Sequence, residues 1–189
     1  MKSARRAAAV LCALLAWWSC PSSSPAAEPG APPESFDCED AFDLIAMTTM
    51  LRCAAWVAPP DADARLAAVR RRLLDAGLAQ PAEFEGLHIA FCPLLQGTGM
   101  LPDPAHLYLD DGLLGMSIDG LAEILAHELQ HRVQFASFGS RGFKCGYVRA
   151  MSACGGCQDR RHPLEAEAYA RQDRARERLL AAPPGGDPR

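Results

Sequence analysis

The segment HELQH, residues 127–131, contains two histidines and a glutamate at a spacing that could support catalysis. On a helix, residues four apart lie on one face, so His127 and His131 can each direct a ring nitrogen at one Zn²⁺ ion. Zinc lowers the pKa of a bound water toward about 7, and Glu128 is placed to take that proton and pass it to a leaving amine. The spacing therefore predicts a zinc site that hydrolyses peptide bonds.

The motif lies within residues 117–137, which have the pattern of a helix that Ser117 or Asp119 can cap. Apolar side chains cover most of this helix, and its polar side chains recur three and four residues apart on one stripe. The stripe consists of Glu123, His127, Gln130, His131 and Gln134. We expect this narrow stripe to line a cleft. The alternative is a surface helix with solvated histidines.

The stretch AEILAHELQHRVQF resembles the active-site helix of zincin metallopeptidases, and its form is similar to short bacterial zincin domains of poorly known function. In the gluzincin branch the third metal ligand comes from a later helix, in a stretch resembling E-x-E-A-D. Here HPLEAEAYA matches it, with Glu165 at the ligand position, Glu167 as the second glutamate and Tyr169 in place of aspartate. The resemblance covers about residues 105–175 and implies Zn²⁺ held by His127, His131 and Glu165.

Several residues that follow the HELQH motif in the sequence have more than one interpretation. Glu165 is the third residue of an expected helix, where capping geometry and the helix dipole favour a glutamate without any metal. Glu167 is the alternative ligand, and His162 is the only later histidine. Gluzincins usually need a donor that stabilises an oxyanion, and His162, Tyr147 and Tyr169 are the candidates here.

The N-terminus has the pattern of a secretory signal peptide over residues 1–26: a basic start, a short apolar run and a small, proline-rich end. A lipid anchor at Cys20 is the alternative. Cleavage removes three basic residues and no acidic one, which takes the net charge from −4 to −7. An acidic exported chain has no electrostatic reason to bind nucleic acid or an anionic membrane, so we expect neither partner and a secreted or periplasmic protein.

Six cysteines follow the signal: Cys38, Cys53, Cys92, Cys145, Cys154 and Cys157. An even number in an exported chain predicts disulfides, in any of fifteen connectivities. Cys38 and Cys53 can pair only if the chain between them turns back, because a straight helix would hold them roughly 22 Å apart. The spacing of the last three, with His162 after them, also fits a zinc knuckle, and Cys154 and Cys157 alone fit a redox motif, although an oxidising compartment favours disulfides.

The remaining segments supply the expected scaffold. Helices are predicted over residues 37–57, 64–78 and 162–182, with Leu66, Val69, Leu73 and Leu74 facing inward from the second and its arginines outward. Residues 87–95 and 105–111 are predicted strands, which either lie in the core or bind an extended substrate by strand addition, as zincins do. Residues 138–161 are predicted to be a disulfide-pinned loop, with a mobile leader over 27–36 and a disordered tail over 183–189.

The sequence thus predicts a single α+β domain over residues 37–182, zincin-like and mainly helical, with a small β-sheet and disulfides. The predicted function is an exported zinc metallopeptidase acting on a peptide or protein, with Glu128 as general base and acid. The alternative is a zinc-binding module of the same kind that does not turn over peptides. A helical interaction protein without metal is the third possibility.

Overall fold

The computed structural model describes residues 37–94 and 97–182. The expected signal peptide (1–26), leader (27–36) and tail (183–189) lie outside the described residues. The chain divides into two units, Met1–Asp37 and Cys38–Arg189, and every helix and strand below belongs to the second.

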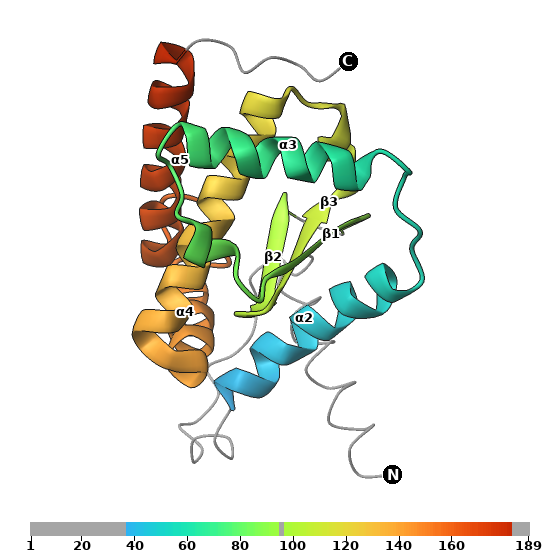
Figure 1. Cartoon of the computed structure of the whole chain (residues 1–189). Coiled ribbons are helices and arrows are strands. Elements are labelled where there is room, and N and C mark those ends of the chain that lie inside the picture. The colour runs from blue at the N-terminus through green and yellow to red at the C-terminus, as the bar shows by residue number, and fades with distance from the viewer. Residues whose placement is uncertain (1–36, 95–96, 183–189) are drawn as a thin grey trace, which may run out of the picture. The chain divides into compact units, whose positions relative to one another are not determined.

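Four long helices and one small sheet form this unit (Figure 1). The helices are α2 (Cys38–Ala54), α3 (Ala62–Asp75), α4 (Ile118–Ala153) and α5 (Pro163–Ala181), and the strands are β1 (His88–Cys92), β2 (Gly99–Asp103) and β3 (His106–Asp110). Short 3₁₀ turns span Pro81–Phe84 and Asp111–Gly115. The predicted α+β class, mainly helical with a small sheet, is confirmed. Within the described ranges no helix is both long and apolar enough to cross a membrane.

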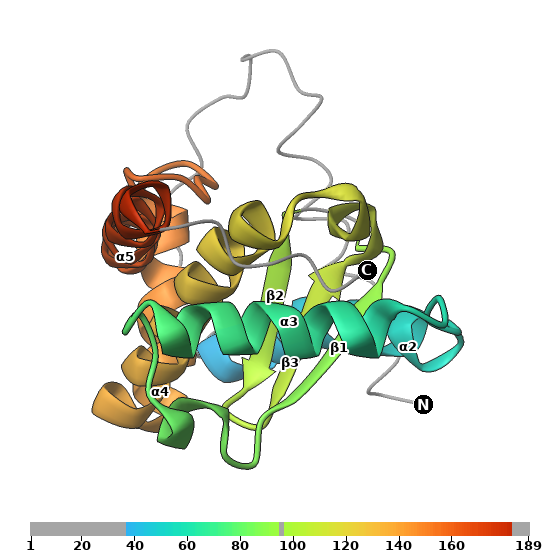
Figure 2. The ribbon, with the colours of Figure 1, turned by 45° about the horizontal axis from the view of Figure 1, so that its top comes forward.

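The sheet has the strand order β1-β3-β2, with β1 parallel and β2 antiparallel to β3. α2 packs on β1 and β2, and α4 packs on β2. In Figure 2, α3 crosses in front of the strands and α2 lies behind them. The sequence did not predict β2, because its Gly-Met-Leu-Pro-Asp stretch has little strand character and is held by pairing with β3. Because β3 is paired on both sides, residues 105–111 cannot pair with a substrate strand. The prediction that this segment could bind an extended substrate by strand addition is therefore wrong.

α3 follows its predicted pattern with two exceptions. The expected core positions that are buried are Leu66, Val69 and Leu73. Leu74 is 36% exposed, and Arg72, expected to face solvent, is only 8% exposed. Arg72 turns inward because it binds the Asp119 carboxylate at 2.6 Å and the Leu179 carbonyl at 3.2 Å. One guanidinium thereby ties α3 to the start of α4 and the end of α5.

The predicted loop over 138–161 is wrong for most of its length, because α4 continues to Ala153. Helical geometry breaks only at Gly139, whose φ of 69° and ψ of 166° favour glycine. Beyond it, Phe143 and Val148 are buried, and the Phe143 ring stacks on Phe135 with centroids 3.9 Å apart. A straight helix would place residues eight apart two turns from each other, so the Gly139 break lets these rings meet.

Three disulfides join the six cysteines of the described chain: Cys38–Cys145, Cys53–Cys92 and Cys154–Cys157. The preference for disulfides over a zinc knuckle is therefore confirmed. α2 is a single helix, and its two cysteines pair with α4 and β1 instead of each other. Because α2 buries only Cys38, Ala41, Phe42 and Ala46, these covalent links fix a helix that has little apolar contact of its own.

Candidate metal centre

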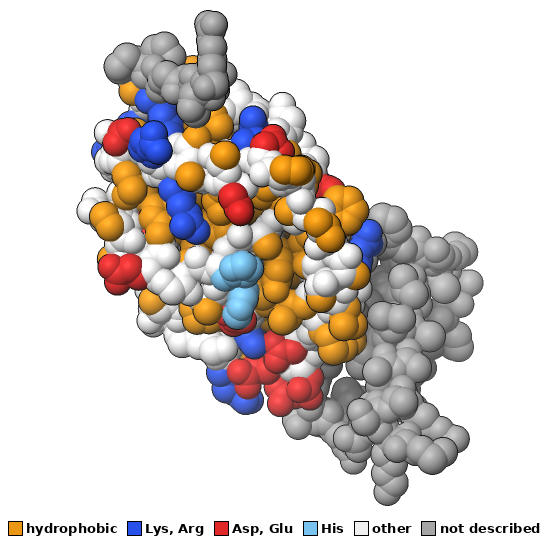
Figure 3. Space-filling model, turned by 45° about the vertical axis from the view of Figure 1, so that its right-hand side comes forward, with side chains coloured by type: hydrophobic (Ala, Val, Ile, Leu, Met, Phe, Trp, Pro, Cys, Tyr) orange, Lys and Arg blue, Asp and Glu red, His pale blue; other side chains and the backbone are white. Residues whose placement is uncertain are grey.

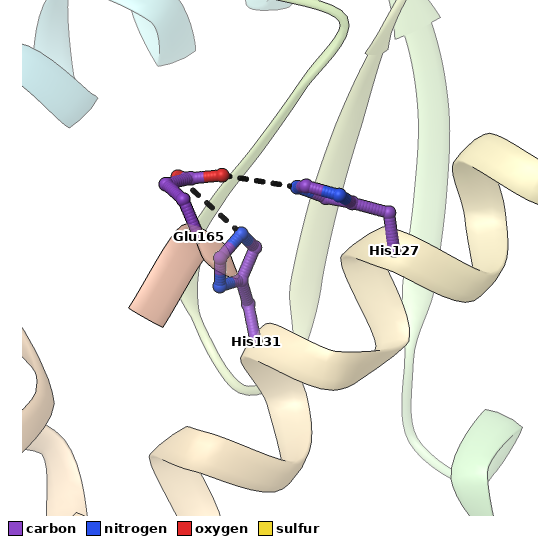
Figure 4. A group of neighbouring side chains, drawn as sticks. All are labelled: His127, His131 and Glu165. Atoms are coloured by element: carbon purple, nitrogen blue, oxygen red, sulfur yellow. Dashed lines mark hydrogen bonds and ion pairs between the residues drawn. The ribbon is translucent and has the colours of Figure 1, made fainter. Parts of the chain in front are cut away.

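His127, His131 and Glu165 meet in the structure, and we call them the histidine–glutamate group (Figure 4). Glu165 lies 38 residues from His127 in sequence, yet its Oε2 is 3.1 Å from His127 Nε2. Its Oε1 is 3.6 Å from His131 Nε2. Ligand atoms on a tetrahedral zinc ion lie about 3.4 Å from one another, given bonds of about 2.1 Å. All three side chains are buried, so this group could hold a metal ion.

Caps at the starts of α4 and α5 help to place these side chains. Ser117 Oγ accepts a hydrogen bond from the Gly120 N–H and caps α4, as predicted for Ser117. His162 caps α5 by accepting from the Glu165 N–H through Nδ1 at 3.4 Å. Its Nε2 donates to the Tyr147 carbonyl at 2.9 Å, and the ring is fully buried. With both nitrogens engaged, His162 is not available as an oxyanion donor.

Gln134 orients His131, a role that the sequence did not predict. Its Oε1 lies 2.8 Å from His131 Nδ1, so Nδ1–H donates and the ring is held with Nε2 towards Glu165. The Gln134 amide donates in turn to the Leu164 carbonyl and to Glu167 Oε2, at 3.0 and 2.9 Å. Glu167 is therefore bound to Gln134 and Glu165 is the glutamate beside the histidines. The only signal in the sequence was that Gln134 belongs to the same polar stripe.

His127 is oriented less firmly than His131. Its Nδ1 is buried and has no hydrogen-bond partner among the described residues. The Tyr169 ring packs against it edge-on, with centroids 4.7 Å apart. A buried polar nitrogen without a partner costs about 1–3 kcal/mol. His127 is thus held by the contact of its Nε2 with Glu165 and by packing against Tyr169.

The Glu165 carboxylate is ionised in this environment. Burial raises its pKa, but hydrogen bonds with His127, His131 and Tyr147 outweigh that effect and hold the pKa well below its usual range. Tyr147 donates from its hydroxyl to Oε1 at 2.6 Å. Burial and the neighbouring charge of Glu165 raise the pKa of Tyr147, so the hydroxyl keeps its proton and remains a donor. Two imidazoles and one charged carboxylate form a donor set that suits zinc.

Glu128 lies beside this group and is 3% exposed. Burial raises its pKa, and the nearby charges of His131 and His127 offset part of that rise. The β2 backbone passes close to it, because a Cβ atom built on Gly99 would collide with the Glu128 carboxyl. A carboxyl with a raised pKa can take up and release a proton nearer neutral pH than an ordinary glutamate. Gly99 is a second neighbour of the site that the sequence did not predict.

Comparisons with protein-family models, curated proteins and solved structures find nothing that matches this chain. The fold and the site define a disulfide-bonded α+β domain that buries a histidine–glutamate group able to hold a metal ion. The resemblance to zincins stays a prediction that rests on the HELQH and HPLEAEAYA residues.

Proposed function

We propose that this protein is an exported zinc-dependent metallopeptidase, with His127, His131 and Glu165 as metal ligands. The observation that carries the proposal is the approach of a buried carboxylate to 3.1 and 3.6 Å from the two Nε2 atoms. A mere helix-capping glutamate would have no reason to lie between two buried histidines. Three protein ligands also match catalytic zinc sites, whereas structural sites close all four positions with side chains.

A bound zinc ion would supply Lewis-acid chemistry, polarising a carbonyl and lowering the pKa of water. Glu128 is the residue proposed to hold and move the proton. Its raised pKa suits a general base, because efficiency is greatest when the pKa lies near the working pH. Gln134 and Tyr147 fix the orientations of His131 and Glu165, so the chain positions its ligands through hydrogen bonds from outside the histidine–glutamate group.

The proposed substrate is an extended peptide that adds to the sheet along β2. Among the described residues β2 pairs with β3 alone, so no strand occupies its other edge. β2 packs on α4, and Gly99 in its first position lies against Glu128. Addition of a substrate strand to β2 would bring a peptide bond to the site. Pro102 has no backbone N–H, so β2 would offer one hydrogen-bond donor fewer than a strand without proline.

Export is proposed from the signal-like N-terminus together with the three disulfides. Disulfides persist in oxidising compartments and are rare where thiols are kept reduced. The pairing of all six cysteines in the described chain therefore supports folding in the periplasm or outside the cell.

The test is a peptidase screen of the zinc-loaded protein beside Glu128→Gln. Activity should fall by about 10²–10⁴-fold, the usual contribution of a general base, while zinc content stays that of the wild type. Equal activity in both proteins would remove Glu128 from the proposal.

A second candidate is a module that holds zinc without hydrolysing peptides. Its support is the low exposure of the four site residues, with Glu128 and Glu165 at 3% and 6%. A substrate carbonyl must reach the metal, and these exposures leave it little room. Stoichiometric zinc with no activity against any peptide in the screen would favour this module over the enzyme.

A further inference from the structure

Two histidines outside the buried site lie next to each other on the sheet. His88 of β1 and His106 of β3 are register partners in the parallel ladder, so their side chains leave the same face of the sheet. Their ring centroids are 6.0 Å apart at an interplanar angle of 71°. The corresponding values for His127 and His131 are 5.1 Å and 78°, so the surface histidine pair (His88 and His106) repeats the ring arrangement at a slightly wider spacing.

Asp103 orients one ring of this pair. It is the β2 register partner of His106, and both of its carboxylate oxygens lie 3.0 Å from His106 Nδ1. Nδ1–H therefore donates to Asp103 and the lone pair of Nε2 is left for another ligand. Metal-binding histidines commonly donate their second nitrogen to a carboxylate in this way. Asp103 is itself fixed, because Oδ1 also accepts from the backbone N–H groups of Ala105 and His106.

Both rings are accessible to an ion from solvent. His88 is exposed and the side chain of His106 is 43% exposed, whereas the other three histidines are buried. Figure 3 shows histidine side chains at the surface, with acidic side chains beside them. Within the described part of the chain, neither nitrogen of His88 nor Nε2 of His106 has a hydrogen-bond partner.

We infer that the surface histidine pair is a second metal site, which takes a divalent ion of the zinc, nickel and copper class. Imidazole nitrogens are preferred ligands for these ions, while calcium and magnesium prefer oxygen. Asp103 acts as the positioning residue for His106. Two protein ligands leave the remaining positions of the ion to water, so this site binds reversibly and more weakly than the histidine–glutamate group. The second site does not depend on the proposed peptidase activity.

Zinc titration followed by proton NMR of the histidine rings tests this site in the oxidised protein. The signals of His88 and His106 should shift together, with a single midpoint, after the first equivalent of zinc is bound. In His88→Ala the midpoint for His106 should rise at least roughly tenfold, because one of the two ligands is gone. In Asp103→Asn, which keeps an oxygen for the backbone contacts, the midpoint should rise by about 10-fold or more.

The inference is overturned if the His88 and His106 signals do not move as zinc is added, or if His106 responds alike in wild type and His88→Ala. Calcium serves as the control ion and should shift neither signal. The His127→Ala/His131→Ala variant separates the two proposals. A shared shift of the surface pair that persists there supports this inference, even if the buried site binds nothing.

Discussion

Tyr147 donates a 2.6 Å hydrogen bond to Glu165, which joins the second half of α4 to the first turn of α5. The same residue accepts a bond at its carbonyl from His162, the cap of α5. Two residues before it, Cys145 is bonded to Cys38 of α2. The carboxylate beside the two histidines is thus positioned by a segment whose composition predicts a loop.

Tyr147→Phe should weaken zinc binding by about 10-fold or more, because loss of the hydroxyl frees the Glu165 carboxylate. A competition titration against a chelator of known affinity measures this. Tyr169→Phe is the matched control, since the ring contact with His127 stays and its hydroxyl bonds to no described residue. Equal losses in the two variants would contradict the role given to the Tyr147 hydroxyl.

Glu165→Gln should abolish zinc binding at the histidine–glutamate group, the tighter of the two proposed sites, while Glu167→Gln should reduce it only slightly. The first substitution removes the charge between the histidines, and the second alters a contact to the Gln134 amide. Isothermal titration calorimetry of both variants with zinc tests the assignment. A larger loss in Glu167→Gln would show that the other glutamate is the ligand.

Gly99→Ala should lower peptidase activity more than zinc affinity. The added Cβ would collide with the Glu128 carboxyl, so the carboxyl or β2 must shift. The zinc ligands are not in that contact and should keep their positions. Activity and metal affinity are measured on the same preparation, with Gly115→Ala as control because a Cβ there meets nothing within 4 Å. Unchanged activity in Gly99→Ala would speak against the placement of Glu128.

The Cys38–Cys145 disulfide should stabilise the fold more than Cys154–Cys157 does. The first closes a separation of 107 residues and the second one of 3, and the stabilisation by chain entropy grows with loop length. Replacing Cys38 and Cys145 by serine should cost roughly 2–5 kcal/mol of unfolding free energy. Urea unfolding of both double variants measures this, and a larger loss for the short loop would refute the expectation.

Local patterns in the sequence are enough to predict α2, α3, α5 and the first half of α4, because each has a helical pattern of residues. They miss the second half of α4, since Gly139, Gly142 and Gly146 give it the composition of a loop. It is held in the fold by packing, which includes the stacking of Phe143 on Phe135, and by the Cys38–Cys145 disulfide. They miss β2 for a similar reason, because it exists through pairing with β3.

The candidate site likewise combines residues that a local pattern predicts with residues that only the fold brings together. The spacing of His127, Glu128 and His131 is local, so the sequence alone predicts that they share one helix. The prediction of Glu165 rests on the resemblance to gluzincins, and its approach to the histidines depends on how α5 packs on α4. The contacts of Tyr147, Gln134 and Gly99 arise between distant segments or from side-chain direction. The sequence places Gln134 only in the polar stripe and marks Tyr147 only as an oxyanion candidate, and nothing in it marks Gly99.

Zinc content is the most direct test of the central claim that the histidine–glutamate group holds a metal. Plasma mass spectrometry should be run on the oxidised protein after zinc loading and dialysis against a weak chelator, which clears loosely bound ions. We expect about one zinc per chain, lost in a His127→Ala/His131→Ala variant whose circular dichroism shows retained helices. No zinc in the wild type, or zinc retained in the variant, would contradict the claim.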